Sequence, residues 1–363
     1  MIRKNFPPPQ AVRLRFFVGI LPEIMIVVLK PNITKKEEAA VLRGIRRLGY
    51  EPRVLRGVER TVIGAIGDER KRHTLETLTA VFPQVESVTP IQKRFKLVSR
   101  EAHRGNSTIT LPNGTVIGGK KFVVMAGPCS VEGEKQLLTT AHAVKKAGAT
   151  VLRGGAFKPR TSPYEFQGLG EKGLKLLAKA RKETGLAVIT ELLSEQHAGM
   201  VADYADILQI GARNAQNFQL LIAAAKTGRP VLLKRGLSMK IDEWLLAGEY
   251  VLAHDNANLM FCERGIRTFE TYTRNTLDLS TIPIIKKESH CPIVIDPSQG
   301  AGKADLVAAM SKGAAAMGAD ALLIEVHPNP AEAWSDGAQQ LTLEGFAKLM
   351  GELQPFIAAA GRD

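Results

Sequence analysis

Basic side chains recur where apolar segments of this sequence of 363 residues end. The segments LRGGAFKPRT, QIGARN, LLKRG and CERG each place arginine or lysine after a run of apolar residues. Guanidinium and ammonium groups match the charge of phosphate and carboxylate oxygens, and arginine also matches their geometry. One arginine in such a place is more often a surface ion-pair partner, but several together favour a substrate with two separated anionic groups, such as two phosphates. The residues are Arg153, Lys158, Arg160, Arg213, Lys234 and Arg264.

A second set of side chains could hold a metal ion. Cys129, Gln299 and Glu325 lie where apolar segments end, and Asp336 lies in the loop that follows the segment of Glu325. A lone buried cysteine is more often a small hydrophobic residue, but a thiolate with two carboxylates suits Mn²⁺, Fe²⁺, Co²⁺ or Zn²⁺. Such an ion could polarise an aldehyde carbonyl as a Lewis acid. A Schiff base on Lys234 is the alternative, although phosphate binding is the simpler role for that lysine.

The elements that must position these residues are eight apolar segments, which alternate with helical stretches from Phe122 onward. Eight strand–helix units in about 240 residues predict a TIM (β/α)₈ barrel, in which the carboxyl ends of all strands meet at one rim. An open doubly wound sheet is disfavoured because no G-x-G-x-x-G follows the first strand. A hairpin with a type I′ turn at Asn113-Gly114 is expected to precede the barrel and to close its bottom.

The segment in front of the barrel has the order β-α-β-β-α-β, which is typical of a ferredoxin-like α+β domain. We assign this domain to residues 24–92, with Thr34 as the N-cap of its first helix, a linker to residues 93–106 and the barrel to residues 107–363. Residues 1–23 contain Pro7 to Pro9 and no A-x-A cleavage site. They are therefore interpreted as a flexible extension rather than a signal peptide.

Composition narrows the cellular setting. The chain has three cysteines and no run of apolar residues long enough to cross a membrane, so a cytoplasmic protein is expected. The formal net charge is +13, and most of the excess lies in residues 1–105 without interleaved aromatic residues. This pattern favours a solvated basic surface over a nucleic-acid partner.

Eight motifs stand out along the chain. They are GPCSVEG, LRGGAFKPRTSPYEFQGLGEKGL, LQIGARNAQNF, VLLKRG, CERGIRTFE, VIDPS, IEVHPNP and SDGAQQL. Taken together, these motifs resemble one enzyme family, the type I 3-deoxy-D-arabino-heptulosonate 7-phosphate (DAHP) synthases, and in particular the Iβ subgroup with a ferredoxin-like front domain. The resemblance runs from about Met25 to the C-terminal helix. It implies condensation of phosphoenolpyruvate with erythrose 4-phosphate, the first step of the shikimate pathway. It also implies a homo-oligomer whose front domain senses an aromatic amino acid, with a pure oligomerisation domain as the alternative.

The resemblance also implies roles for the basic residues. Arg213, Lys234 and Arg264 would bind the phosphate of phosphoenolpyruvate. Arg153 and Lys158 would hold the same substrate and orient the reacting centre.

The remaining implied roles concern the second substrate and the support of the site. Arg160 and Thr161 would grip erythrose 4-phosphate, and Glu191 and Asp296 would support the site. The enol carbon would attack the aldehyde, water would add to the other carbon, and phosphate would leave.

The chain departs from the family pattern at one expected metal ligand. The family has Asp-Pro-Ser-His after the seventh strand, and its histidine binds the metal, whereas this chain has Gln299. With Cys129, Glu325 and Asp336 as the other ligands, we expect weaker metal binding or a preference for a hard ion such as Mn²⁺. The departure leaves two alternatives: condensation with another aldose phosphate in a secondary pathway, or a catalytically weakened regulatory paralogue.

Overall fold

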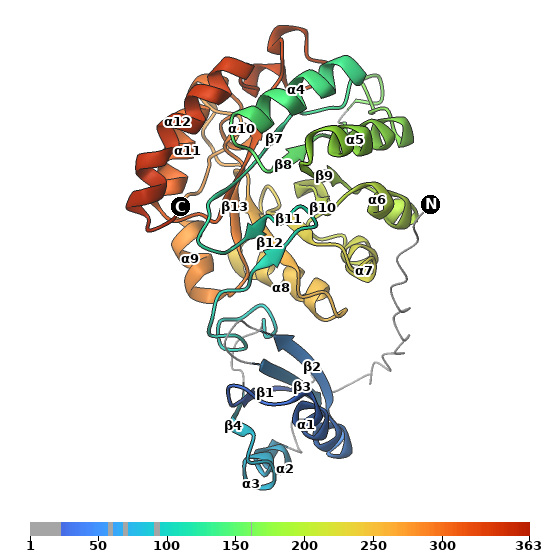
Figure 1. The fold of residues 1–363 in the computed structure, drawn as a ribbon, viewed down its shortest axis with the longest axis vertical. Coiled ribbons are helices and arrows are strands. Elements are labelled where there is room, and N and C mark those ends of the chain that lie inside the picture. Colours follow the sequence, from blue (N-terminus) through green and yellow to red (C-terminus); the bar gives the residue numbers. More distant parts are fainter. Residues whose placement is uncertain (1–22, 57–60, 68–71, 91–94, 161) are drawn as a thin grey trace.

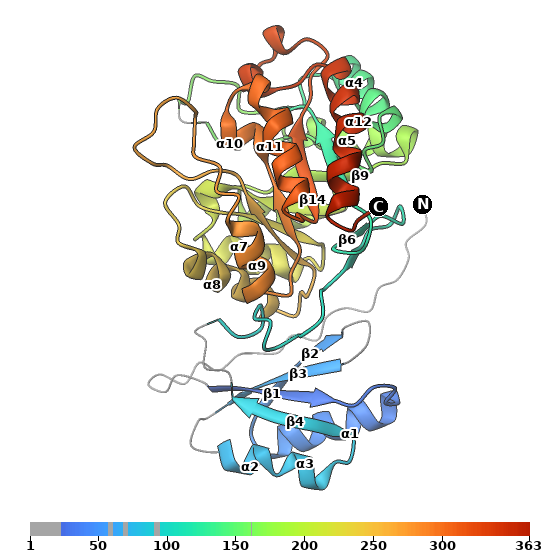
Figure 2. The same ribbon diagram turned by 90° about the vertical axis from the view of Figure 1, so that its left-hand side faces the viewer.

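A computed structural model describes residues 23–56, 61–67, 72–90, 95–160 and 162–363. It contains a small α+β domain and a larger barrel, joined by one segment (Figures 1 and 2). The expected N-terminal extension lies outside the described residues, apart from Glu23, and part of the expected linker also lies outside them.

The small domain is a four-stranded antiparallel sheet in the order β2-β3-β1-β4, with helices on one face (Figure 2). This order confirms the predicted ferredoxin-like fold. Thr34 caps the first helix as expected, because Glu37 N donates to Thr34 Oγ1 at 3.3 Å and Thr34 N donates to Glu37 Oε2 at 2.8 Å. The elements are β1 (Glu23–Leu29), α1 (Lys35–Arg47), β2 (Glu51–Arg56), β3 (Thr61–Gly67), α2 (Arg72–Glu76), α3 (Leu78–Val81) and β4 (Val85–Pro90).

Eight parallel strands close into the barrel in the order β10-β11-β12-β13-β14-β7-β8-β9. The ring closes where β14 pairs with β7, with Glu325 opposite Gly127. This confirms the predicted TIM barrel. The strands are β7 (Val123–Gly127), β8 (Val151–Arg153), β9 (Ala187–Glu191), β10 (Ile207–Ile210), β11 (Val231–Lys234), β12 (Leu259–Glu263), β13 (Ile293–Ile295) and β14 (Ala321–Glu325).

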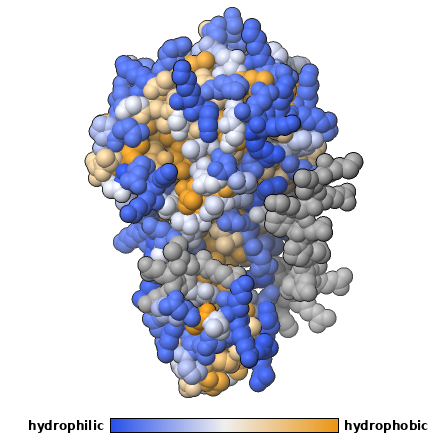
Figure 3. All heavy atoms as spheres, viewed as in Figure 1, coloured by the Kyte–Doolittle hydropathy of each residue, from blue (hydrophilic) through white to orange (hydrophobic). Residues whose placement is uncertain are grey.

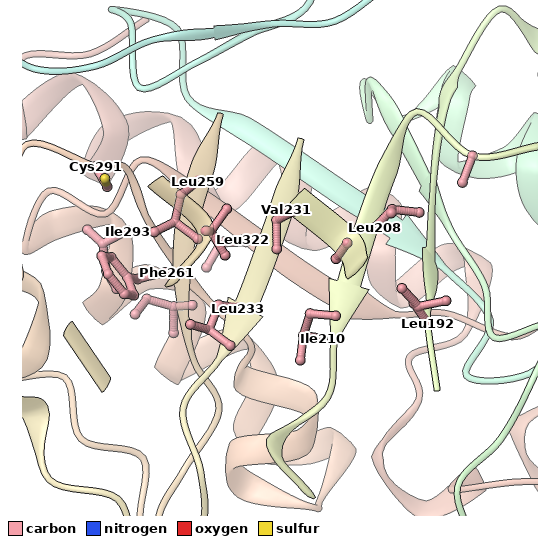
Figure 4. Packing of buried hydrophobic residues seen from close by; sticks show 14 of the residues in the cluster. Leu192, Leu208, Ile210, Val231, Leu233, Leu259, Phe261, Cys291, Ile293 and Leu322 are labelled. Carbon is pink, nitrogen blue, oxygen red and sulfur yellow. The ribbon is translucent and has the colours of Figure 1, made fainter. Parts of the chain in front are cut away.

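Helices surround the barrel on its outside (Figure 1). Side chains that point outward from the strands, such as Leu208, Ile210, Val231 and Leu233, form the layer between strands and helices (Figure 4). In the view of Figure 3, hydrophilic residues cover most of both domains. Within the described residues, no helix is both long and apolar enough to span a membrane. The helices are α4 (Glu134–Lys146), α5 (Glu171–Thr184), α6 (Ala198–Tyr204), α7 (Phe218–Lys226), α8 (Ile241–Leu252), α9 (Thr281–Glu288), α10 (Pro297–Ala301), α11 (Ala304–Ala316) and α12 (Leu343–Ala359).

A hairpin of β5 (Ile109–Thr110) and β6 (Val116–Ile117) closes the amino-terminal end of the barrel, because its apolar side chains pack with the side chains inside it. The expected type I′ turn is wrong. Only Gly114 has a positive φ, of 83°, and Gly114 N donates to Leu111 O at 2.9 Å. Pro112 fixes a negative φ at the first central position, which favours a type I turn followed by a left-handed glycine.

Candidate active site

The carboxyl ends of the barrel strands surround a cavity of about 240 Å³. The closed ring of parallel strands brings together side chains that are up to about 180 residues apart in the sequence, since Arg153 ends β8 and Asp336 follows β14. A larger cavity of about 750 Å³ lies between the front domain and the barrel, lined in part by Arg53 and Asp255, and is separate from this rim. The rim cavity is lined by Arg153, Lys158, Pro159, Arg160, Glu165, Glu191, Gln209, Gly211, Ala212, Arg213, Lys234, Arg264, Arg274, Gln299 and Asp336.

One side of this cavity carries positive charge that the protein leaves unpaired. Within the described residues, neither Arg213 nor Arg264 has a carboxylate oxygen within 4.0 Å, whereas Lys234 Nζ donates to Asp296 Oδ2 at 2.6 Å. Arg264 is only 7% exposed. Burial lowers its pKa, and the nearby Arg274 guanidinium lowers it further, although Asp296 opposes this. The buried Arg264 and the exposed Arg213, neither paired with a carboxylate among the described residues, form a site prepared for an anion.

Arg153 and Lys158 lie beside this charge and connect it to the candidate metal ligands. Arg153 Nη1 donates to Glu325 Oε1 at 2.7 Å and to Pro128 O at 3.0 Å, and its buried Nε has no partner among the described residues. Lys158 Nζ lies 3.0 Å from Cys129 Sγ. Burial works against the charged lysine, but Cys129 and Glu325 outweigh it and raise the pKa of Lys158. Both cations therefore stay charged inside the barrel.

Cys129, Glu325 and Asp336 converge, and their potential ligand atoms lie within 4.8 Å of one another. Cys129 Sγ donates to Asp336 Oδ2 at 3.4 Å. Burial, together with the charge of Glu325, raises the pKa of Cys129 to about 12. A divalent cation would reverse this effect, since a coordinating thiol is deprotonated. One sulfur and two carboxylates in this arrangement fit a divalent metal ion.

Gln299 lies at the same place, but it presents donors to the carboxylates. It belongs to the short helix α10, in which Gln299 N donates to Asp296 Oδ1 at 2.9 Å. Its side-chain Nε2 donates to Glu325 Oε1 at 3.1 Å and to Asp336 Oδ2 at 3.2 Å. Its Oε1 accepts from Arg264 Nη2 at 2.7 Å. The amide oxygen, which is the atom that could bind a metal, therefore faces a guanidinium.

The other expected residues lie around the rim. Arg160 lines the cavity and its Nε donates to Glu165 Oε2 at 2.9 Å, while Thr161 lies outside the described residues. Glu191 accepts a hydrogen bond from Gln209 Nε2 at 3.4 Å. Glu191 also packs against Gly211, where a Cβ atom would lie 1.9 Å from Glu191 Oε1. A larger residue at position 211 would therefore displace the Glu191 carboxylate.

Two residues that sequence reasoning missed complete the carboxylate cluster. Arg274 Nη1 lies 3.2 Å from Asp336 Oδ1 and donates to Gln339 Oε1 at 2.9 Å. Gln339 Nε2 donates to Glu325 Oε2 at 2.7 Å. Arg274 lies eleven residues beyond the end of β12, in a loop where no strand pattern marks its direction.

His327 follows β14 and could have been a further ligand, but it faces away from the cluster. Its Nδ1 accepts from Asn329 N at 3.1 Å, so its Nε2 carries the proton and donates to Glu132 Oε2 at 3.1 Å.

Comparison with known families assigns both parts of the chain. Residues 25–93 match the DAHP synthase ferredoxin-like domain, and residues 103–359 match the DAHP synthetase I family. The chain belongs to the DAHP synthetase I family. This agrees with the resemblance seen in the motifs of the sequence.

Two similar proteins are named for sugar acids of different chain length, a heptonate and an octonate. The chain is 50% identical over 337 residues to phospho-2-dehydro-3-deoxyheptonate aldolase of Thermotoga maritima, covering 93% of this chain and 99% of the relative. It is 32% identical over 273 residues to 2-dehydro-3-deoxyphosphooctonate aldolase of Caulobacter vibrioides, covering 69% and 93%.

Solved structures agree with this relationship. The crystal structure of the Thermotoga maritima DAHP synthase superposes with a TM-score of 0.74 at 49% identity, covering 94% of this chain and 99% of that one. A truncated form of the Thermotoga maritima enzyme gives a TM-score of 0.70 at 49% identity, covering 74% of this chain and 98% of that one.

Proposed function

We propose that this DAHP synthetase I family member condenses phosphoenolpyruvate with D-erythrose 4-phosphate to form DAHP and phosphate. The observation that carries the proposal is a cavity that is lined by several cations and that borders, at Asp336, the cluster of Cys129, Glu325 and Asp336. A relative named for the seven-carbon acid is 50% identical to the chain, against 32% for one named for the eight-carbon acid. With three carbons from phosphoenolpyruvate, a seven-carbon product requires a four-carbon aldose.

Phosphoenolpyruvate would occupy the cationic side of the cavity. Arg213, Lys234 and Arg264 would bind its phosphate. Among the described residues, no carboxylate lies within 4.0 Å of Arg213 or Arg264, and Asp296 positions Lys234. Arg153 would use its buried, unpartnered Nε to hold the same substrate next to the reacting centre.

Erythrose 4-phosphate would bind on the side of the cavity that Arg160 lines. Arg160 and Thr161 would hold the phosphate of erythrose 4-phosphate. The ion pair between Arg160 and Glu165 would have to break for Arg160 to bind that phosphate. Glu191 and Asp296 would support the site. Asp296 does so through Lys234, and Glu191 through its contact with Gln209.

The chain's own residues would then guide the bond changes. The enol carbon of phosphoenolpyruvate bonds to the aldehyde carbon, and the aldehyde oxygen becomes a hydroxyl by taking a proton. Lys158 is the buried acid next to the cluster, and we assign this proton to its Nζ. Water adds to the carbon that bears the phosphate group and gives one proton back to Lys158 Nζ. The bond from this carbon to the phosphate oxygen then breaks, and inorganic phosphate leaves with the bonding electrons and the second proton of the water as the keto group forms.

A divalent metal ion held by Cys129, Glu325 and Asp336 would polarise the aldehyde carbonyl as a Lewis acid. Mn²⁺ is favoured over Fe²⁺, Co²⁺ or Zn²⁺, because the chain lacks the imidazole that late first-row metals prefer at the position of Gln299.

The test is turnover of the two substrates by the purified protein with added Mn²⁺. We expect one phosphate released for each seven-carbon product. Turnover with a five-carbon aldose phosphate in place of erythrose 4-phosphate would favour the second candidate, a condensation in a secondary pathway. A folded protein that is inactive with either aldose and every one of the four metals would instead be a regulatory paralogue. Gln299 is the observation that motivates both alternatives.

The front domain and the cellular setting are part of the proposal. We assign residues 24–92 to a regulatory domain that responds to an aromatic amino acid, residues 93–106 to the linker and residues 107–363 to the catalytic domain of a homo-oligomer. Inhibition assays with tyrosine and phenylalanine test the regulatory role. The buried free thiols of Cys129, Cys262 and Cys291 support a cytoplasmic location.

A further inference from the structure

The orientation of the Gln299 amide is determined by its partners on both sides. The carboxylates of Glu325 and Asp336 can only accept hydrogen bonds when ionised, so they require the amide nitrogen. The Arg264 guanidinium can only donate, so it requires the amide oxygen. Turning the amide over would place an N–H group against the guanidinium and an oxygen against both carboxylates.

This orientation conflicts with a role as a metal ligand. To act as a ligand of a cation at Glu325 and Asp336, Gln299 would have to present its amide oxygen, and that oxygen accepts a hydrogen bond from Arg264. The amide N–H groups donate hydrogen bonds to both carboxylates, and so occupy oxygen atoms that a bound cation would also contact. Gln299 thus competes with a cation for the same carboxylate oxygens.

We propose that Gln299 is a bridge rather than a metal ligand, and that it couples anion binding at Arg264 to divalent-cation binding at the Cys129, Glu325 and Asp336 cluster. The inference rests on the proposed function only in placing the phosphate of phosphoenolpyruvate at Arg264.

The anion side of the coupling follows from the surroundings of Arg264. Its one hydrogen-bond partner within the described residues is Gln299, and it pairs with no carboxylate there. A bound phosphate competes for the guanidinium N–H groups and releases the amide oxygen. The released amide can leave the carboxylates at a lower cost in free energy, so the cluster accepts a cation more readily. By thermodynamic reciprocity, a bound cation tightens anion binding by the same factor.

The first experiment measures Mn²⁺ binding by calorimetry in the absence of any anionic ligand, for the full chain and for Gln299→Leu and Gln299→Met. A ligand role requires both variants to bind Mn²⁺ more weakly. A bridge role predicts that both bind it more tightly, by roughly tenfold, because two hydrogen bonds to charged groups no longer need to break. Weaker binding in both variants, with unchanged melting temperatures, would overturn the proposal.

The second experiment repeats these titrations with saturating phosphoenolpyruvate, corrected for Mn²⁺ that the ligand itself binds in solution. In the wild type, the anion should raise Mn²⁺ affinity by roughly tenfold, within the usual range of coupling between sites. In Gln299→Leu, the direct attraction between Mn²⁺ and the anion remains. The factor by which phosphoenolpyruvate raises Mn²⁺ affinity should therefore be smaller than in the wild type but still above one. Equal factors in the two proteins would overturn the coupling.

Gln339→Leu is the matched control. Gln339 also donates an amide N–H to Glu325, at 2.7 Å, but it contacts Arg274 instead of Arg264. This variant should keep the wild-type coupling factor, whereas a loss as large as in Gln299→Leu would overturn the proposal. The binding data are independent of turnover. An inactive protein that shows the coupling would reject the proposed function alone, and an active one without the coupling would reject only the bridge.

Discussion

Replacing Arg264 by methionine should separate substrate binding from stability. The side chain is 7% exposed, and burial lowers the pKa of its guanidinium with help from Arg274. A base whose pKa is lowered on folding holds its charge at a cost in free energy. Methionine removes that charge, and with it the hydrogen bond to Gln299. We therefore expect the free energy of unfolding to stay within about 1 kcal/mol of the wild type.

The same variant should bind phosphoenolpyruvate much more weakly. A hydrogen bond to a charged group contributes about 1.5–3 kcal/mol. Its loss corresponds to a rise in KM for phosphoenolpyruvate of roughly tenfold to 150-fold. Because the phosphate contact is present before and during the reaction, kcat should change less than KM.

Lys234→Met is the comparison variant, because it removes a cation that does have a protein partner. Asp296 is fully buried and pairs with Lys234 at 2.6 Å. Breaking a buried ion pair costs about 3–5 kcal/mol, which lowers the melting temperature of a domain this large by roughly 6–20 °C. Thermal unfolding by circular dichroism and steady-state kinetics measure both effects. If Arg264→Met lowers the melting temperature as far as Lys234→Met while KM is unchanged, Arg264 is structural and our reasoning is refuted.

Three further predictions follow from the site and the barrel. Chelation should abolish turnover and added Mn²⁺ should restore it, whereas full activity in the presence of chelator would contradict a metal-dependent reaction. Gln299→His should bind Mn²⁺ more tightly than the wild type, because it introduces an imidazole ligand. Gly211→Ala should lower kcat without unfolding the barrel, since its Cβ would lie 1.9 Å from Glu191 Oε1; unchanged kinetics would show that Glu191 can move freely. Burial lowers the pKa of His290 to about 3, despite its hydrogen bond to Leu97 O, so below pH 6.5 only the unfolded chain takes up this proton. The free energy of unfolding should therefore fall by about 1.4 kcal/mol per pH unit from pH 6.5 toward pH 3. Chemical denaturation at a series of pH values measures this dependence, and it should be weaker in His290→Gln.

The fold could be predicted because each level of the sequence pointed to the same architecture. Eight apolar segments alternating with helices predict a closed parallel barrel, and in such a barrel the carboxyl ends of the strands meet at one rim. That rule alone predicted that Arg153 and Lys234 line one cavity and that Glu325 lies beside Arg153. The capping of α1 by Thr34 was equally local and was confirmed.

Features that depend on loops and on competing local contacts could not be predicted in this way. Arg274 and Gln339 reach the cluster from loops, whose direction no periodic pattern reveals. The order β-α-β-β-α-β predicts one second helix in the front domain, but the structure has two short helices there, α2 and α3. Thr77 lies between them and donates its hydroxyl to Thr74 O at 2.6 Å. Sequence showed that Gln299 replaces a histidine, but only the contact with Arg264 showed which way its amide faces.

The most direct test of the central claim is the reaction of phosphoenolpyruvate and erythrose 4-phosphate with the purified chain and Mn²⁺, followed by the release of phosphate and by the mass of the sugar acid. We predict equal amounts of phosphate and a seven-carbon product, and loss of both in Lys158→Met. No product from a folded protein, or an eight-carbon product formed preferentially from a five-carbon aldose phosphate, would contradict the account.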